Sequence, residues 1–294
     1  MTTFDKQYDL YRTAVEESFS EFIPENKEDL LVEAMRYSLL AGGKRLRPVL
    51  ALAWCDLCGD DYKKALPSAS AVEMIHTYSL IHDDLPCMDD DTLRRGRPTN
   101  HVVYGESVAL LAGSGLYDRA IRTLLQFGPR YGLSQQGVLD SLDVLTSASG
   151  LDGILTGQVL DIKNSERTVD GAYLERVNEL KTASMIEASC MLGCIAAGAD
   201  GEIIDRAREY GRAVGHAFQI RDDILDVIST ADQLGKTPGK DSEENKTTLV
   251  DVLGLDGAQD AVRHLTDVAL ELLDSFPNNA FLRTLTERMC GREA

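Results

Sequence analysis

The chain has 294 residues, enough for one large domain or two average ones, and 44% of them are hydrophobic, as in ordinary globular proteins. Its 48 acidic and 30 basic side chains give a formal net charge of −18, which repels nucleic acids and anionic membrane surfaces. No apolar run reaches the roughly 18 residues of a membrane span, and the first residues lack the basic-then-apolar order of a secretory signal. We therefore expect a cytoplasmic protein with no transmembrane segment and no nucleic-acid partner.

Apolar residues recur at helical spacing through most of the chain, and no sustained period-two alternation suggests a sheet. The predicted helices cover residues 31–39, 48–57, 66–84, 107–127, 134–162 with glycine interruptions, 172–197, 202–229 and 258–276. Loops are predicted after Pro86 and over 231–248, a long segment rich in Gly, Lys, Asp and Glu. The pattern predicts one all-α domain over 1–294, a large bundle of about ten helices.

The six cysteines are few for this length, and a reducing cytosol would keep them as thiols. Cys55 and Cys58 form a single Cys-x-x-Cys with no second pair and no histidine at zinc-finger spacing. We expect free thiols in a helical core.

A first acidic stripe lies on the predicted helix 202–229. Asp222, Asp223 and Asp226 stand at i, i+1 and i+4, and Gln219 extends the same face by one turn. The flanking residues are apolar, so the helix should be largely buried, and buried carboxylates need cations. This favours metal ligands over a solvated acidic face.

A second acidic cluster surrounds Pro86. The proline should end the helix after Asp84 and let the chain bulge, so that Asp83 and Asp89 converge. Oxygen ligands without paired Cys or His favour Mg²⁺ over zinc, and the adjacent His82 is interpreted as a packing residue. Because Mg²⁺ usually takes one or two carboxylates and completes its shell with substrate phosphates, the clusters imply a phosphorylated substrate.

Basic residues accompany the acidic ones, as an anionic substrate requires in so acidic a protein. Lys44, Arg45 and Arg47 form one run, and the segment from Arg94 to Arg97 forms another. Arginine and lysine suit phosphate binding, although a short basic run can also be a solvated patch. His76 could donate to an anion or be structural, and isolated lysines such as Lys181 and Lys236 are usually surface residues.

With these residues assembled, the chain resembles the trans-isoprenyl diphosphate synthases, and most closely the bacterial farnesyl diphosphate synthases. The resemblance covers residues 31–255. Its motifs are Gly-Lys-Arg-Leu-Arg-Pro at 43–48, His-Thr-Tyr-Ser-Leu-Ile-His-Asp-Asp-Leu-Pro at 76–86, Arg-Arg-Gly at 94–96, Gly-Gln at 157–158, Lys-Thr at 181–182 and Phe-Gln-Ile-Arg-Asp-Asp at 218–223. It implies the isoprenoid synthase fold, a helical bundle around a central active-site cavity, and a homodimer.

The resemblance also implies roles for particular residues. Three Mg²⁺ ions would be held by Asp83, Asp89 and Asp222, supported by Asp84, Asp223 and Asp226. Arg94, Lys181 and Lys236 would contact the allylic diphosphate, dimethylallyl or geranyl diphosphate, with Lys246 near it on the loop. Lys44, Arg47, His76 and Arg95 would bind isopentenyl diphosphate, and Thr182 and Gln219 would lie beside the reacting carbons.

Product length in this family depends on side chains one turn below the first aspartate motif, here Tyr78 and Ser79. A bulky Tyr78 and four residues between Asp84 and Asp89 favour farnesyl over geranylgeranyl diphosphate. Tyr78 could instead be only a core aromatic, which would leave the length open.

Two positions depart from the family pattern, since Ser114 replaces a common aspartate and the chain ends without a basic tail. Neither change removes a proposed metal ligand. A terpene cyclase and a non-catalytic partner subunit are weaker alternatives. The intact aspartate motifs disfavour a partner subunit, and the set of Lys44, Arg47 and Arg95 disfavours a cyclase.

Overall fold

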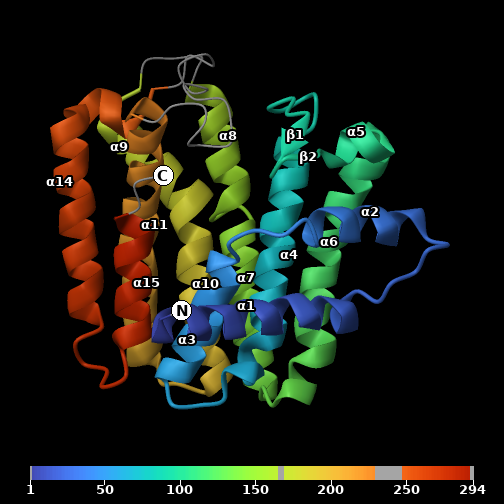
Figure 1. Ribbon diagram of the computed structural model, residues 1–294, viewed down its shortest axis with the longest axis horizontal. Coiled ribbons are helices and arrows are strands. Elements are labelled where there is room, and N and C mark those ends of the chain that lie inside the picture. The colour runs from blue at the N-terminus through green and yellow to red at the C-terminus, as the bar shows by residue number, and fades with distance from the viewer. Residues whose placement is uncertain (1, 165–168, 229–246, 292–294) are drawn as a thin grey trace. The chain divides into compact units, whose positions relative to one another are not determined.

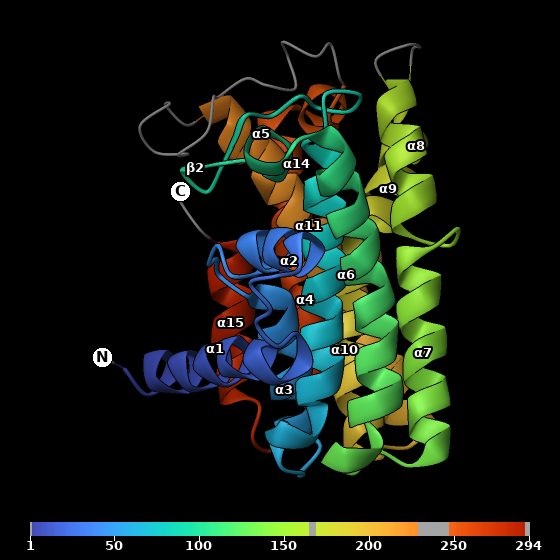
Figure 2. The ribbon, with the colours of Figure 1, turned by 90° about the vertical axis from the view of Figure 1, so that its right-hand side faces the viewer.

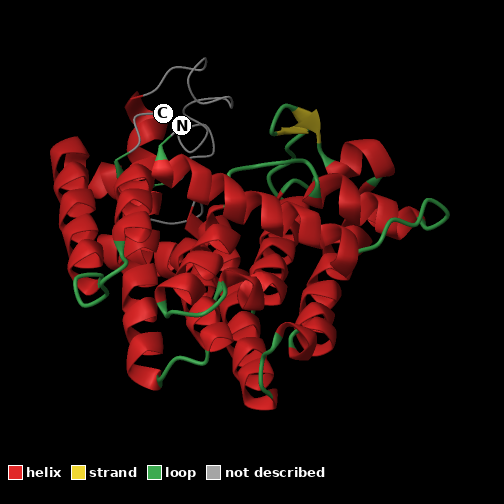
Figure 3. Cartoon of the chain, turned by 60° about the horizontal axis from the view of Figure 1, so that its bottom comes forward, coloured by secondary structure: helices red, strands yellow, loops and turns green. Residues whose placement is uncertain are grey.

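A computed structural model describes residues 2–164, 169–228 and 247–291, and most of these residues are helical (Figures 1 and 3). The described strands are β1 (Leu93–Arg94) and β2 (Arg97–Pro98), a two-residue antiparallel pair. The all-α prediction is therefore confirmed. Most of the predicted long loop at 231–248, including Lys236 and Lys246, lies outside the described residues.

The described residues divide into two compact units, and a single domain over 1–294 stays a prediction. One unit is drawn from Met1–Asp143 and Leu192–Ala199, and the other from Val144–Met191 and Asp200–Ala294. The first unit contains α1 (Thr3–Phe22), α2 (Leu30–Leu39), α3 (Leu46–Leu57), η1 (Tyr62–Ala65), α4 (Leu66–Asp83), the β1–β2 hairpin, α5 (Asn100–Tyr104), α6 (Glu106–Phe127), η2 (Pro129–Tyr131) and the start of α7 (Gln135–Ser149).

The core of the first unit is built around α4. Every residue from 66 to 75 is buried, because α3 and α6 pack along this helix (Figures 1 and 2). A helix buried all round leaves few positions for charges, since burying an ion without a partner is costly. The acidic residue Glu73 in the middle of α4 therefore needs a buried cation beside it.

The second unit contains the helices that follow the Gly150–Gly153 break. They are α8 (Ile154–Asn164), α9 (Gly171–Asn178), the π-helical turn η3 (Glu179–Ala183), most of α10 (Ser184–Ala197), α11 (Gly201–Ile228), α14 (Leu249–Leu272) and α15 (Ala280–Cys290). The long helix α11 packs along α14, and η3 packs against both α8 and α11.

The predicted helices agree with the structure except at the chain ends, after the β1–β2 hairpin and near Gly254. Three described α-helices lie outside the predicted set: α1, α15 and the five-residue α5. The signals for α1 were present, because Thr2 and Asp5 form a capping box and Tyr11, Val15 and Phe19 make a buried stripe. The predicted helix 258–276 corresponds to the part of α14 after Gly254. At Gly254 the backbone is not helical (φ 71°), and α14 has an additional first turn before this residue.

The interval 171–197 is one continuous run of helix, formed by α9, η3 and α10. It is the one helix among the described residues that is long and apolar enough to cross a membrane, by length and composition alone. The interval is not an unbroken apolar run, because it contains Lys181 and Glu187. In its most apolar window 67% of the residues are buried within the protein, which is typical of a core helix.

The cysteines are free thiols, as expected. The sulfur of Cys58 lies 3.7 Å from that of Cys194.

Candidate functional site

The aspartate cluster around Pro86 is a closed bulge at the end of α4. The helix stops at Asp83, and the backbone N–H of Asp89 donates to the carbonyl of Asp83 over 2.9 Å. Asp90 takes a left-handed conformation with φ of 51°, which turns the chain back. The bulge expected at Pro86 is present, and it brings Asp89 next to Asp83, with both carboxylates partly exposed.

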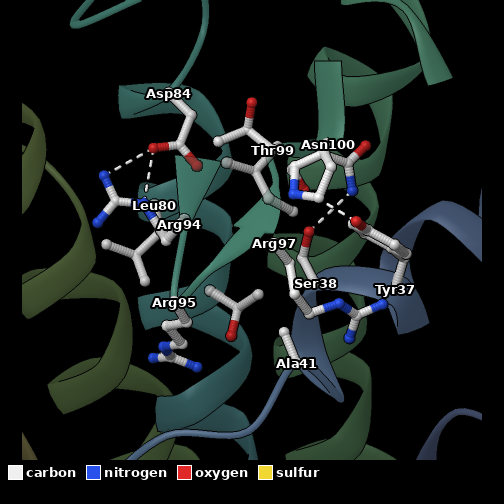
Figure 4. Close-up of a pocket in the computed structure, with 13 residues that line it drawn as sticks. Tyr37, Ser38, Ala41, Leu80, Asp84, Arg94, Arg95, Arg97, Thr99 and Asn100 are labelled. Atoms are coloured by element: carbon white, nitrogen blue, oxygen red, sulfur yellow. Dashed lines mark hydrogen bonds and ion pairs between the residues drawn. The ribbon is translucent and has the colours of Figure 1, made fainter. Parts of the chain in front are cut away.

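The neighbouring Asp84 has a different environment. Its side chain is 5% exposed, and the Arg94 guanidinium donates to its Oδ1 over 2.6 and 2.7 Å (Figure 4). Burial raises the pKa of Asp84, and the positive charge of Arg94 opposes that rise. A second ion pair of 3.3 Å joins Arg94 to Asp91. Arg94 is thus anchored to the aspartate loop from two sides.

The second basic run approaches the first through Arg95. Its guanidinium donates to the carbonyl of Gly42 and covers Gly43, where an added Cβ would lie 2.7 Å from Arg95 Cζ. Gly43 has φ of 133°, so only glycine combines this backbone angle with such a close approach. The exposed Lys44 follows directly, and the two basic runs therefore form one cationic cluster.

His76 on α4 belongs to the same cluster. Its pKa is held well below 6.5, first by burial and then by the positive charges of Arg47 and Arg95. The imidazole is therefore neutral at physiological pH and offers one N–H donor. The structure brings His76 together with Arg47 and Arg95, two of the residues that the resemblance assigns to isopentenyl diphosphate.

Arg45 was expected, with Lys44 and Arg47, in a basic run suited to phosphate binding, and the structure corrects this. It is 3% exposed and left-handed, with φ of 53°. It donates to Glu73 Oε1 over 2.6 Å and to the carbonyl of Leu39 over 2.7 Å. Arg45 points into the core while Lys44 stays exposed, so this ion pair orients the turn. The signal in the sequence was Glu73, a single acidic residue in an apolar helix.

Tyr78 and Ser79 lie on α4 before the aspartate bulge. Tyr78 is 6% exposed, and its ring packs edge-on against His82 at 5.1 Å and Tyr117 of α6 at 5.4 Å. Burial raises the pKa of Tyr78 to about 12, so the phenol stays neutral. His82 also contacts the carbonyl of Leu110 at 3.1 Å, consistent with a packing residue. The Ser79 hydroxyl donates to the carbonyl of His76.

In the second unit, η3 presents Lys181 and Thr182 between α8 and α11. Lys181 Nζ forms a 2.6 Å ion pair with Asp161 Oδ2, where the aspartate is 14% exposed. π-Turns of this kind often occur at functional sites. Asp161 was not predicted, although it stands one turn after Gly157 and therefore shares its helix face.

The acidic stripe of α11 begins with a hydrogen-bonded chain of side chains. Thr182 donates to Gln219 Oε1 over 2.8 Å, and Gln219 Nε2 donates to Asp223 Oδ1 over 2.9 Å. These two hydrogen bonds fix the orientation of the Gln219 side-chain amide. Asp222 and Asp226 are partly exposed on either side of the buried Asp223.

The α11 stripe fits a hard cation. Asp226 Oδ1 is buried and accepts no hydrogen bond from the part of the chain that the structure describes, which is costly for a carboxylate oxygen unless a cation meets it. The donors are all oxygens, as Mg²⁺ prefers. Over the described ranges, no three side chains of His, Cys, Asp or Glu group closely enough to hold an ion by themselves. Mg²⁺ characteristically takes its remaining oxygens from water and substrate phosphates.

Comparison with known proteins identifies the family. The polyprenyl synthetase family matches residues 28–275. The chain belongs to this family. A chloroplastic geranylgeranyl pyrophosphate synthase of Capsicum annuum is 43% identical over 264 residues, covering 90% of this chain and 71% of that protein.

Solved structures of polyprenyl synthetases share the fold. An FPP/GFPP synthase from Zymomonas mobilis has a TM-score of 0.88 at 34% identity, covering 97% of this chain and 98% of that one. A geranyltransferase from Legionella pneumophila has a TM-score of 0.87 at 31% identity, covering 98% and 96%. The fold is therefore the all-α isoprenoid synthase fold, as expected. The general activity is prenyl transfer, the reaction that elongates prenyl diphosphates.

Ser114 is a surface feature in this polyprenyl synthetase. Its exposed hydroxyl donates to the carbonyl of Leu110 one turn earlier on α6. A hydroxyl of this kind replaces the aspartate common in the family without leaving a buried polar group unpaired.

Gly157 sets the distance between α8 and η3, and replacing it with alanine should disturb Lys181. The new Cβ would lie 2.5 Å from Lys181 N and 2.8 Å from Leu180 C, backbone atoms that cannot rotate away. We expect Gly157→Ala to cost about 1–3 kcal/mol of unfolding free energy and to lower activity. Urea denaturation and kcat/KM measure the two effects.

Gly201→Ala is the matched control, because nothing lies within 4 Å of its added Cβ at the start of α11. It should leave both measurements near wild type, since alanine favours helix. Equal effects of the two substitutions would refute the close-approach explanation.

Proposed function

We propose that this chain is a farnesyl diphosphate synthase. It would condense isopentenyl diphosphate with dimethylallyl diphosphate, and then with geranyl diphosphate, to release pyrophosphate and farnesyl diphosphate. The observation that carries the product length is Tyr78, a buried ring clamped against His82 and Tyr117 five residues before Asp83. An aromatic wall at this place would stop a growing chain.

In the proposed reaction the allylic C–O bond breaks and pyrophosphate leaves with the bonding electrons. The alkene of isopentenyl diphosphate attacks the allylic cation, a C–C bond forms, and a proton is lost to the departing diphosphate. No protein nucleophile is required. The protein contributes by stabilising negative charge on the leaving diphosphate and by excluding water.

The proposed roles follow the two units. In the first, Lys44, Arg47, His76 and Arg95 bind isopentenyl diphosphate, and Arg94 contacts the allylic diphosphate. A neutral His76 suits this role, because it can donate a proton in a hydrogen bond without the cost of a further buried charge beside the arginines.

In the second unit, Lys181 contacts the allylic diphosphate while Thr182 and Gln219 lie beside the reacting carbons. The hydrogen bonds from Thr182 to Gln219 and from Gln219 to Asp223 support this role, since they hold the polar groups in a fixed orientation. Lys236 and Lys246 are proposed to contact the same diphosphate.

Mg²⁺ is the proposed cofactor. Its ligands would be Asp83, Asp89 and Asp222, supported by Asp84, Asp223 and Asp226, and three ions are expected from the family resemblance. When bound, Mg²⁺ neutralises the diphosphate and makes it a better leaving group. The unsatisfied Asp226 oxygen supports a cation at α11.

Geranylgeranyl diphosphate is the second candidate product. The Capsicum annuum relative, at 43% identity, is named a geranylgeranyl pyrophosphate synthase. An Arabidopsis thaliana relative, at 45% identity, is named the large subunit of a heterodimeric geranylgeranyl pyrophosphate synthase. These names fit a twenty-carbon product at least as well as a fifteen-carbon one. Chromatography of the dephosphorylated products, made with excess isopentenyl diphosphate, separates the two by chain length.

Tyr78→Ala should lengthen the product. Removing the ring opens the space between α4 and the Tyr117 side chain, so the chain can grow by at least one further five-carbon unit. The expected result is a change of the main product from fifteen to twenty or more carbons at similar overall turnover. Tyr104→Ala, which removes a partly exposed tyrosine on α5, serves as control.

A fifteen-carbon product from Tyr78→Ala would remove Tyr78 from the length-setting role. A twenty-carbon product from the wild-type protein would favour the geranylgeranyl alternative. Pyrophosphate release without isopentenyl diphosphate, together with a hydrocarbon product, would indicate a terpene cyclase, and no turnover with any allylic primer would favour a non-catalytic subunit.

A homodimer located in the cytoplasm is also proposed. Exposed leucines on α6 support an interface, since Leu110 and Leu111 are 48% and 58% exposed. Light scattering after gel filtration measures the oligomeric state.

A further inference from the structure

The β1–β2 hairpin carries two of the proposed diphosphate-binding arginines on very little regular structure. Each strand has two residues, and the turn between them has positive φ at Arg95 (54°) and Gly96 (73°). Such a short hairpin is not stable by itself. Its conformation must therefore be imposed by the helices that it contacts.

The hairpin rests on one side chain of α2. The Tyr37 hydroxyl donates to the carbonyl of Pro98 over 2.9 Å, and the Arg97 guanidinium lies over the Tyr37 ring with its carbon 4.5 Å from the ring centre. Tyr37 thus contacts both residues of β2. Figure 4 shows Tyr37 and Arg97 beside each other on the side of the pocket away from Asp84.

The chain that leaves the hairpin is attached to the same helix. Asn100 is 2% exposed, and its Nδ2 donates over 2.8 Å to the carbonyl of Ala34. The same Nδ2 donates over 2.8 Å to Ser38 Oγ (Figure 4). Thr99 closes the base of the hairpin by donating from its N–H to the carbonyl of Thr92 and from its hydroxyl to the carbonyl of Asp91.

The tip of the hairpin returns to the end of α2. Arg95 donates to the carbonyl of Gly42, three residues after the last helical residue, Leu39. α2 therefore supports the hairpin through Tyr37 and also leads directly into the turn that carries Lys44. A partly open pocket lies between the hairpin, α2 and α4, and Tyr37, Arg95 and Arg97 are among the residues that line it.

The two arginines differ in how they are held. Arg94 has ion pairs with Asp84 and Asp91 that do not involve α2. The described hydrogen bond of the Arg95 side chain goes to Gly42 alone. The position of Arg95 should therefore depend on the attachment of the hairpin to α2 more strongly than the position of Arg94 does.

We propose that Tyr37 is a positioning residue for isopentenyl diphosphate. It holds β2 on α2 so that Arg95 stays in register with Lys44 and Arg47, and it acts on the substrate only through Arg95. This inference rests on the proposed function, since it takes Arg95 as a ligand of isopentenyl diphosphate. It adds a residue that none of the sequence motifs of the site contains.

Tyr37→Phe tests the inference with one atom removed. Loss of a hydrogen bond is worth about two- to tenfold in an equilibrium constant. We expect KM for isopentenyl diphosphate to rise about three- to tenfold, while KM for geranyl diphosphate and kcat stay within about twofold of wild type. Tyr37→Leu should raise the same KM further, because Arg97 then loses the ring beneath it.

Tyr104→Phe is the matched control. The Tyr104 ring packs against Tyr37 at 5.5 Å, and its hydroxyl donates to Glu33 over 3.2 Å rather than to a residue of the hairpin. Wild-type kinetic constants are expected. A general loss of folded protein would lower the apparent kcat and leave KM for isopentenyl diphosphate and KM for geranyl diphosphate unchanged. That result for Tyr37→Phe would overturn the proposal.

A double-mutant cycle with Arg95→Lys shows whether Tyr37 acts through Arg95. In the double variant, KM for isopentenyl diphosphate should rise by less than the product of the two single-variant increases. The reason is that Arg95, once displaced by the loss of Tyr37, already contributes less to binding. Multiplicative effects would mean that the two residues act independently and would refute the proposal.

Calorimetric titration with isopentenyl diphosphate separates this inference from the proposed function. A rise of about three- to tenfold in Kd for Tyr37→Phe supports the positioning role even if the wild-type protein fails to elongate any primer, in which case only the proposed function falls. An unchanged Kd in an actively elongating enzyme overturns the positioning role alone.

Discussion

Asp222→Asn is expected to lower kcat/KM at least about a hundredfold, because it removes a charge from the acidic stripe of α11. A metal ion contributes several kcal/mol to a reaction of this kind, and each 1.36 kcal/mol is a factor of about ten in rate. The buried Oδ1 of Asp226 on the same face has no hydrogen-bond partner among the described residues, which supports the proposed metal site. Steady-state kinetics at increasing Mg²⁺ measures the loss.

Asp205→Asn on the same helix is the control for Asp222→Asn. Asp205 is 63% exposed and pairs only with Arg208 within α11 among its described partners, so its loss should leave the rate within about twofold. Binding of Mg²⁺ with inorganic pyrophosphate, followed by calorimetry, should weaken in Asp222→Asn and not in Asp205→Asn. Near-normal turnover of Asp222→Asn at saturating Mg²⁺ would contradict the metal assignment.

Glu73→Leu is expected to destabilise the protein by about 3–5 kcal/mol, because it leaves the Arg45 charge buried without its partner. Glu73 is 2% exposed and Arg45 is 3% exposed, so solvent cannot replace the lost carboxylate. The loss corresponds to a fall in Tm of roughly 5–8 °C for a chain of 294 residues. Thermal and urea denaturation measure it.

The controls for Glu73→Leu use the same arginine. Glu16 lies 3.5 Å from Arg45 Nε but is 40% exposed, so Glu16→Gln should cost at most about 1 kcal/mol. The double variant Arg45→Met with Glu73→Leu should recover part of the loss, since it removes both buried charges. A Glu73→Leu protein as stable as wild type would show that the ion pair does not stabilise the turn at Lys44.

Much of the helical architecture could be predicted from sequence, because helix formation depends on residues a few positions apart. The periodic stripes of α2, α4, α6 and α11 and the stop at Gly42 are signals of that range. The acidic stripe on α11 and the bulge after Pro86 are equally local. The first turn of α14 before Gly254 and the β1–β2 hairpin were missed, because both are too short for a periodic pattern.

The distant partners of the site could not be predicted. Arg45 and Glu73 are 28 positions apart, Lys181 and Asp161 are 20 apart, and Tyr37 and Pro98 are 61 apart. No local period relates such residues. The sequence indicated only that Glu73, as a charge in an apolar helix, required a partner.

By itself, the sequence determined the all-α class, the two acidic clusters, the basic runs and a family resemblance that the comparisons confirmed. Those properties depend on residue types at short spacing. The tertiary structure decided how the basic runs join through Arg95 and Gly42, which ring backs Tyr78, and how α2 holds the hairpin. These contacts form only when helices pack and desolvate their side chains, so they are determined by which distant surfaces meet.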